Sequence, residues 1–156
     1  MDVLLVSVGA TAGWRGAARG LMDALTRAGV SVAIAQAGPA PAVRTFMATD
    51  LVQARTARRA AELGIQKHAP TAVVYCSMTA ALLWPRPGAI GLDTIAAENR
   101  PGRHGLWQRP VERRRLAQAP LLLTMAPESL APHRGRSCAP SVVVQVPVTR
   151  TDDGRG

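Results

Sequence analysis

The order of apolar runs near the start of the chain limits the fold more than any other feature of the sequence. Val3–Val8 is short and almost wholly apolar and ends at Gly9, which predicts a strand buried on both faces. A glycine-containing turn follows, and apolar residues then recur at helical spacing from Ala18 to Leu25. Val30–Ala35 is the next predicted strand. The first 37 residues therefore predict a strand–helix–strand unit.

The same alternation continues along the rest of the chain. Thr49 or Asp50 is the expected N-cap of a second helix that runs to about Lys67, and another helix is expected to begin near Pro110. The further predicted strands are Thr71–Cys76, Ala89–Leu92, Leu121–Thr124 and Val142–Val148, with a short helix or turn at Thr79–Leu83. This pattern is typical of an α/β fold, a Rossmann-like parallel sheet with helices on both faces. We expect a single domain over residues 1–148 and a polar tail or truncated linker over residues 149–156.

Composition narrows the classes of protein to consider. The net charge is +9 and all but one of the 19 basic residues are arginine, which favours phosphorylated substrates, nucleic acid or an acidic membrane surface as partners. A GC-rich gene would produce the same bias toward Arg, Ala, Gly and Pro. No apolar run approaches the roughly 20 residues of a membrane span, and the start of the chain lacks a signal-peptide pattern. Two isolated cysteines fit a reducing compartment. We therefore expect a cytoplasmic protein, with peripheral contact at the inner membrane surface left open.

One segment, Asn99–Arg115, gathers six arginines and a histidine around a Gly-Pro-rich loop and is offset only by Glu112. It supplies +5 of the total charge of +9. Guanidinium groups held this close together are stabilised by a nearby anion, so the segment is a candidate binding loop. A solvated basic face is the alternative. Trp107 either stacks on a ligand or on a guanidinium group, or anchors the loop by packing.

Three segments follow the predicted strands and are expected to meet. Ligands of parallel sheets bind at the carboxyl ends of strands, beside the point where the strand order reverses. Gly9–Trp14, the turn after Cys76 and the chain from Asp93 onward all leave such ends, so we expect one shared crevice. Asp93 is the candidate catalytic carboxylate there, with helix capping or pairing with an arginine as the alternative. His104 is either an acid or hydrogen-bond donor to a ligand, or a loop histidine without a role.

The glycine turn after the first strand does not match a dinucleotide fingerprint. Gly9 and Gly13 have the wrong spacing for G-x-G-x-x-G, and Gln36 stands near where an acidic residue would bind a ribose. The turn either brings a phosphate or sugar close to backbone N–H groups or serves close packing. No catalytic triad, carboxylate pair or zinc-ligand spacing is found in the sequence. We predict no bound cofactor and no metal.

Four segments resemble glycosyltransferases of the GT-B fold, in particular the family 4 type. MDVLLVSVGATAGWRGAARGLMDALTRAGVSVAIAQA is similar to the opening of their N-terminal acceptor domain, with its glycine turn and its "raG-V-V" helix end. HAPTAVVYCS resembles the "PDVVHxH" strand, with Thr71 in place of Asp. VERRRLAQAPLLLTMAPESL resembles the "ER…L..AD.VI..SE" segment, with Pro120 in place of Asp, and SVVVQVPV resembles the last strand before the second domain. Together these segments span nearly the whole chain.

The resemblance implies transfer of a sugar from a nucleotide-sugar donor to an unknown acceptor, an activity of the hexosyltransferase type. It places Asp93 near the reacting sugar, the glycine turn at the donor phosphates and the arginine loop at an anionic acceptor or the diphosphate. The substrate-binding candidates are Gly9, Gly13, Arg15, Arg100, Arg103 and His104. The nucleotide-binding second domain of such enzymes is missing from this sequence, so we expect little or no turnover without it.

A non-enzymatic function is the second hypothesis for the chain. A basic Rossmann-like module would bind RNA or an anionic membrane surface through its arginines. Nucleic acid is the weaker of these partners, because one tryptophan among the arginines is not a stacking platform for bases. Salt dependence separates the hypotheses, since only phosphate binding weakens steeply as salt rises.

Overall fold

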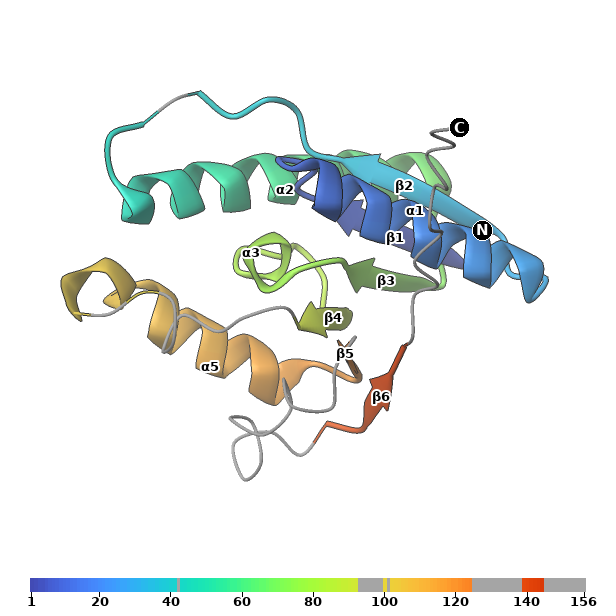
Figure 1. Cartoon of the computed structure of the whole chain (residues 1–156). Coiled ribbons are helices and arrows are strands. Elements are labelled where there is room, and N and C mark those ends of the chain that lie inside the picture. Colours follow the sequence, from blue (N-terminus) through green and yellow to red (C-terminus); the bar gives the residue numbers. More distant parts are fainter. Residues whose placement is uncertain (42, 93–99, 101, 125–138, 145–156) are drawn as a thin grey trace, which may run out of the picture.

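The structure is a computed structural model that describes residues 1–41, 43–92, 100, 102–124 and 139–144. Its strands form one parallel sheet in the spatial order β2-β1-β3-β4-β5-β6 (Figure 1). The strands are β1 (Val3–Ser7), β2 (Val32–Gln36), β3 (Ala72–Tyr75), β4 (Ala89–Leu92), β5 (Leu122–Thr124) and β6 (Ser141–Val143). The helices are α1 (Ala12–Arg27), α2 (Phe46–His68), α3 (Met78–Ala81), the 3₁₀ helix η1 (Gly102–Gly105) and α5 (Gln108–Gln118). The predicted α/β fold with a parallel sheet is confirmed.

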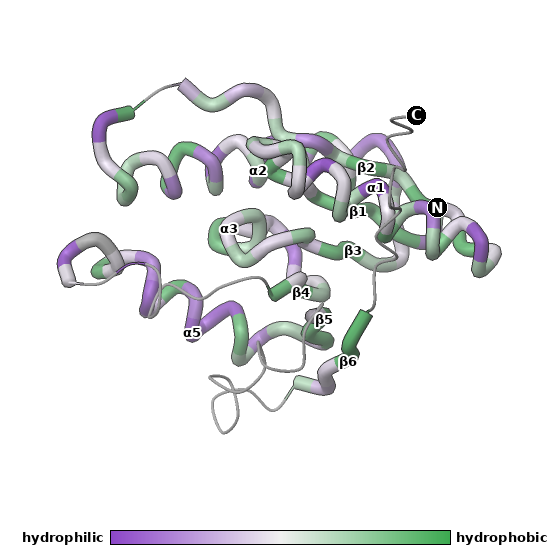
Figure 2. The backbone as a smooth tube through the Cα atoms, in the orientation of Figure 1, coloured by the Kyte–Doolittle hydropathy of each residue, from purple (hydrophilic) through white to green (hydrophobic). Residues whose placement is uncertain are grey.

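Helices cover both faces of this sheet. Leu5 of β1 belongs to a cluster with Leu21 and Leu25 of α1, so α1 covers one face. Leu4, the neighbouring residue of β1, belongs to the larger cluster that contains buried apolar residues of α2, α3 and α5. Successive side chains of a strand point to opposite faces, which is why a strand buried on both faces is apolar throughout. In Figure 2 the strands near the centre are coloured hydrophobic, whereas much of α5 is hydrophilic.

Small residues allow α2 to pack closely against the sheet. Ala54, Ala57, Ala61 and Gly64 are buried on α2 at spacings of three and four residues, which places them on one side of the helix. A Cβ atom added to Gly64 would lie only 2.9 Å from Cδ2 of Leu4. This side of α2 therefore accepts no larger residue without a shift of the core.

The start of α2 differs from the prediction. The helix begins at Phe46, and its N-cap is Thr45, whose Oγ1 accepts a hydrogen bond of 3.2 Å from the N–H of Ala48. Thr49 and Asp50 were therefore wrongly predicted as caps. Thr45 has the same capping chemistry, but the exposed apolar side chain of Phe46 hides the start of the helical pattern. The extra turn carries Thr49 and Asp50 inside the helix, over the edge of the sheet.

Other boundaries shift by smaller amounts. α5 begins at Gln108, two residues before the predicted Pro110. In the described part of the last predicted strand, β6 ends at Val143. Residues 145–148, and with them the expected end of the domain, lie outside the described residues.

Candidate functional site

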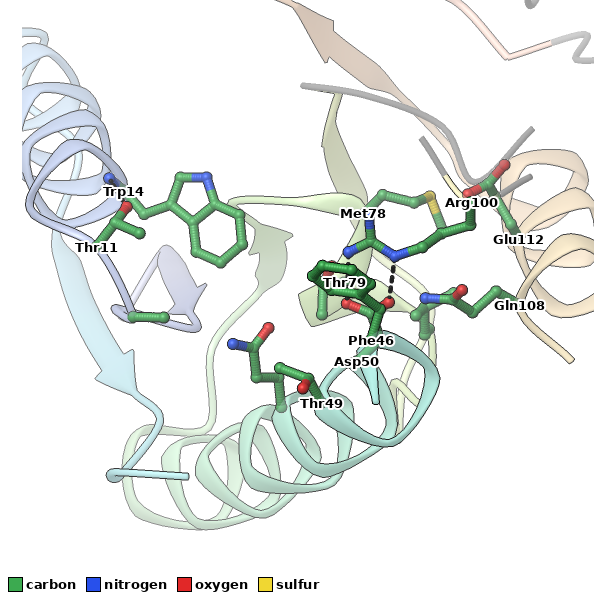
Figure 3. A pocket seen from close by; sticks show the side chains of 13 residues that line it. Thr11, Trp14, Phe46, Thr49, Asp50, Met78, Thr79, Arg100, Gln108 and Glu112 are labelled. Atoms are coloured by element: carbon green, nitrogen blue, oxygen red, sulfur yellow. Dashed lines mark hydrogen bonds and ion pairs between the residues drawn. The ribbon is translucent and has the colours of Figure 1, made fainter. Parts of the chain in front are cut away.

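A cavity of about 270 Å³ lies at the carboxyl edge of the sheet (Figure 3). The strand order reverses between β1 and β3, because the chain passes from β1 to β2 on one side and from β2 back to β3 on the other. The cavity is lined by residues that follow these two strands, Thr11 and Trp14 after β1 and Met78 and Thr79 after β3. A cavity therefore lies at the switch point, where the sequence predicted a shared crevice.

The arginine-rich segment reaches the same cavity. Arg100, Gln108 and Glu112 line it opposite the β1 turn, so the three segments predicted to converge do converge. A fourth segment was not predicted to take part: Thr49, Asp50 and two further residues come from the first turns of α2. The missed signal is an Asp within a helix whose inward residues are otherwise small and apolar.

Asp50 and Arg100 form a bidentate ion pair across 50 positions of sequence. The Nε and Nη2 atoms of Arg100 donate hydrogen bonds of 2.6 and 3.0 Å to the two carboxylate oxygens of Asp50. The Asp50 side chain is only 4% exposed and that of Arg100 is 24% exposed. Hydrogen bonding to Asp50 raises the pKa of Arg100, and the guanidinium carbon lies 5.4 Å from the centre of the Phe46 ring. The pair ties the arginine-rich segment to α2.

Two further polar side chains of the cavity are buried. Gln108 and Glu112 are 4% and 5% exposed and lie one turn apart on α5. The Oε1 atom of Gln108 has no hydrogen-bond partner among the residues that the structure describes. A buried acceptor without a partner is rare and costs stability, so this atom needs an explanation. Figure 3 shows Gln108 extending from α5 toward the side of the cavity that holds Asp50.

Two other arginines of the arginine-rich segment, Arg109 and Arg115, hold that segment in place. Arg109 Nη2 donates a hydrogen bond of 2.6 Å to the carbonyl oxygen of Arg100. A Cβ atom at Gly105 would lie 2.6 Å from that same oxygen, so only glycine permits the packing. Arg115 Nε donates a hydrogen bond of 3.0 Å to the carbonyl oxygen of Leu82. Its guanidinium carbon lies 5.1 Å from the centre of the Trp84 ring. Burial lowers the pKa of Arg115.

The remaining arginines of the segment, Arg103, Arg113 and Arg114, are exposed. The six arginines of the arginine-rich segment therefore divide into two groups of three. One half joins α2, η1, α3 and α5 through hydrogen bonds and stacking, and the other half faces solvent. Only the second half matches the solvated basic face that we gave as the alternative.

The glycine turn lies beside a second cavity of about 550 Å³, which shares Ala10, Thr49 and Gln53 with the first. Gly9 lines this second cavity with φ of 64°, and a Cβ atom there would lie 2.7 Å from Gln36 Nε2. Left-handed backbone and close contact both favour glycine at this position.

The other predicted site residues are placed as follows. Arg15 Nη1 donates to the Gly9 carbonyl at 2.8 Å and so holds the glycine turn. Gly13 lies in the first turn of α1 and lines neither cavity, and Arg103 on η1 also lines neither. The backbone of His104 is part of η1, but its side chain is outside what the structure describes. Asp93 lies outside the described residues.

Two features that would narrow the function, a metal site and a membrane-spanning helix, are absent from the described residues. Within the described ranges, no three His, Cys, Asp or Glu side chains are grouped so that they could hold a metal ion. The same ranges contain no helix with the length and hydropathy needed to cross a bilayer. No protein-family model matches the chain, and no curated protein matches it significantly.

Proposed function

We propose that the chain is the acceptor-side half of a glycosyltransferase, active when a domain that binds a nucleotide-sugar donor completes it. The observation that carries the proposal is the lining of the first cavity. Hydroxyl, amide and carboxylate groups lie around it, together with the indole of Trp14. Its position at the switch point is where the ligands of parallel α/β sheets bind.

This lining suits a sugar chemically. Each sugar hydroxyl both donates and accepts a hydrogen bond, and Thr11, Thr49 and Gln53 offer groups that can do the same. The C–H face of a sugar ring is apolar and matches an indole face such as that of Trp14. The cavity volume, about 270 Å³, lies near the lower limit of small-molecule pockets and suits a single ring.

Asp93 is the proposed catalytic carboxylate, since it directly follows Leu92, the last residue of β4. A carboxylate beyond the carboxyl end of this strand would lie at the edge of the sheet that carries the cavity. There it would interact with the reacting sugar.

The test begins with the reading frames next to the gene. One of them should encode a Rossmann-like nucleotide-binding domain, and the two proteins should be assayed together against uridine, guanosine and adenosine diphosphate sugars. We expect release of nucleoside diphosphate only when both are present. Asp93→Ala should abolish the release, whereas Asp23→Ala, an exposed position on α1, should leave it unchanged. Release that survives Asp93→Ala removes that residue from the mechanism, and no release from any donor refutes the proposal.

The exposed arginines favour one alternative function, a basic binding module. Arg103, Arg113 and Arg114 would contact the phosphates of RNA without using the cavity. Such binding would weaken steeply between 50 and 200 mM salt, as is usual for phosphate contacts. Fluorescence anisotropy with a labelled single-stranded RNA measures this slope. The transferase proposal predicts only weak RNA binding, unchanged by substitutions in the cavity.

A further inference from the structure

We propose that a group of exposed apolar side chains at one end of the molecule docks onto an anionic lipid bilayer. These side chains belong to Val43, Phe46, Met47 and Leu106, and we call them the apolar patch. The inference goes beyond the proposed function, because it holds whether or not the chain transfers a sugar. Three observations carry it: the exposure of these side chains, their gathering from two segments and the charges beside them.

The first observation is how exposed the apolar patch is. Phe46 is 68% exposed and Leu106 is 66% exposed, the highest values among the large hydrophobic residues that the structure describes. Phe46 is the one phenylalanine of the chain, whereas the aromatic residues Tyr75 and Trp84 are buried. Side chains that remain in water add nothing to the core. Where several of them gather, they mark an interaction site.

The second observation is that contacts between two distant segments gather these side chains. The guanidinium carbon of Arg100 lies 5.4 Å from the centre of the Phe46 ring. A Cβ atom at Gly105 would lie 2.6 Å from the carbonyl oxygen of Arg100, and Leu106 follows Gly105 directly. Arg100 thus connects Phe46 to the turn that carries Leu106. The start of α2 and η1 lie at the same end of the molecule, and the two helices are in contact (Figure 1).

The third observation is the charge beside the apolar patch. Arg44 and Arg103 are exposed, one in each of the two segments. The ranges 43–49 and 102–111 contain no Asp or Glu, and Asp50, the next residue of α2, is buried and paired with Arg100. Exposed apolar side chains flanked by arginines are typical of proteins that bind the surface of anionic membranes. The apolar groups enter the acyl boundary while the guanidinium groups stay among the phosphates.

A bilayer fits this surface better than RNA does. RNA offers phosphates to the arginines, and its bases stack on aromatic rings, but only one of the four side chains in the apolar patch is aromatic. A bilayer offers both parts of the match, a charged headgroup layer and an apolar interior beneath it. Phe46 lines the first cavity and Val43 lines the second, so docking would hold both cavities against the headgroups.

The experiment measures co-sedimentation of the full chain with vesicles. Vesicles of phosphatidylcholine alone are compared with vesicles in which about a third of the lipid is phosphatidylglycerol, at low and at high salt. We expect the anionic vesicles to bind the chain at least tenfold tighter than the neutral ones, and the difference to shrink at high salt because the charges are screened. Equal binding to both kinds of vesicle overturns the proposal, and so does binding to neither.

Substitutions in the apolar patch separate insertion from charge attraction alone. Phe46→Ser and Leu106→Ser should each weaken binding to the anionic vesicles about five- to tenfold, since each removes a side chain that enters the bilayer. Leu106→Ser does so without disturbing the contact between Phe46 and Arg100. Leu63→Ser is the matched control, because Leu63 is 59% exposed on the same helix, roughly 25 Å from Phe46, and it should leave binding unchanged. Wild-type binding in both patch variants, or an equal loss in Leu63→Ser, refutes insertion.

The flanking arginines give a second set of variants. Arg44→Gln and Arg103→Gln should each weaken binding to the anionic vesicles about fivefold. Arg19→Gln removes an exposed arginine of α1, on the other face of the sheet, and should change binding by less than about twofold. Equal losses in all three variants would show that the net charge alone attracts the chain, contrary to the proposal.

Two other occupants of the apolar patch are tested with the same proteins. If Phe46→Ser and Leu106→Ser weaken binding of a labelled single-stranded RNA as much as binding of vesicles, the surface binds nucleic acid. If they convert a dimer of the chain into a monomer in gel filtration, a second copy covers the surface. Either result contradicts the bilayer proposal.

Discussion

The Asp50–Arg100 pair offers the sharpest test of how the cavity is built. Arg100→Met removes the cation and leaves a carboxylate whose side chain is only 4% exposed. Asp50→Asn removes the anion and leaves a guanidinium that is 24% exposed and can be hydrated from one side. A buried charge that loses its partner costs about 3–5 kcal/mol, and partial exposure lowers this cost. We therefore expect a loss of about 3 kcal/mol for Arg100→Met and about 1–2 kcal/mol for Asp50→Asn.

Urea unfolding followed by circular dichroism at 25 °C measures these losses in both single variants and in the double variant. Because the residues share two hydrogen bonds, the double variant should be about 1–3 kcal/mol more stable than the sum of the single losses predicts. In thermal melts, Arg100→Met should lower the midpoint by roughly 6–12 °C, at about 2–4 °C for each kcal/mol. Losses that are equal in the two single variants, or that add to within about 0.5 kcal/mol, would refute this account of the pair.

Three other positions give independent tests. Gly64→Ala should destabilise the protein by about 1–2 kcal/mol, although alanine favours helices, because the added Cβ lies 2.9 Å from Leu4 Cδ2. A variant that is more stable in urea unfolding would contradict the close packing of α2. Arg115→Lys should cost about 1–2 kcal/mol through lost stacking on Trp84, while the neighbouring Arg114→Lys should change stability by less than about 0.5 kcal/mol. In a Cys138→Ser background, Cys76 should not react with Ellman's reagent at pH 8 unless urea is added, because burial raises its pKa to about 12; fast reaction of the folded protein would refute this.

The sheet could be predicted from sequence because its signals are local. The run Val3–Val8 is almost wholly apolar and does not alternate, which is typical of a strand covered on both faces. The helical pattern after it indicates a strand–helix–strand unit. Parallel pairing then follows from the helical crossover between the strands. The common edge at which β1, β3 and β4 end is a consequence of that pairing, so the position of the cavity was predictable before its lining was.

Most of the cavity lining was not predictable, because it depends on contacts between distant segments. The pair of Asp50 and Arg100 spans 50 positions and forms only because α2 crosses back over the sheet to the far side of β1. The one local sign of its burial is that Asp50 is in line with the small apolar residues on the inward side of α2, and its sequence neighbours suggested a cap instead. Burial of a single carboxylate is decided by the partner that tertiary structure supplies.

The arginine-rich segment shows how one compositional signal can join two physical roles. Arg114 and Arg115 are neighbours, yet one faces solvent and the other stacks on Trp84, because successive residues of a helix point about 100° apart. The inward side of α5 carries Gln108 and Glu112 where apolar residues would be expected, so a search for apolar periodicity does not detect that side. The inward side of α5 thus packs through polar side chains, whose burial costs stability unless they are paired. Which of them find partners is decided by the tertiary structure, so a sequence pattern cannot predict it.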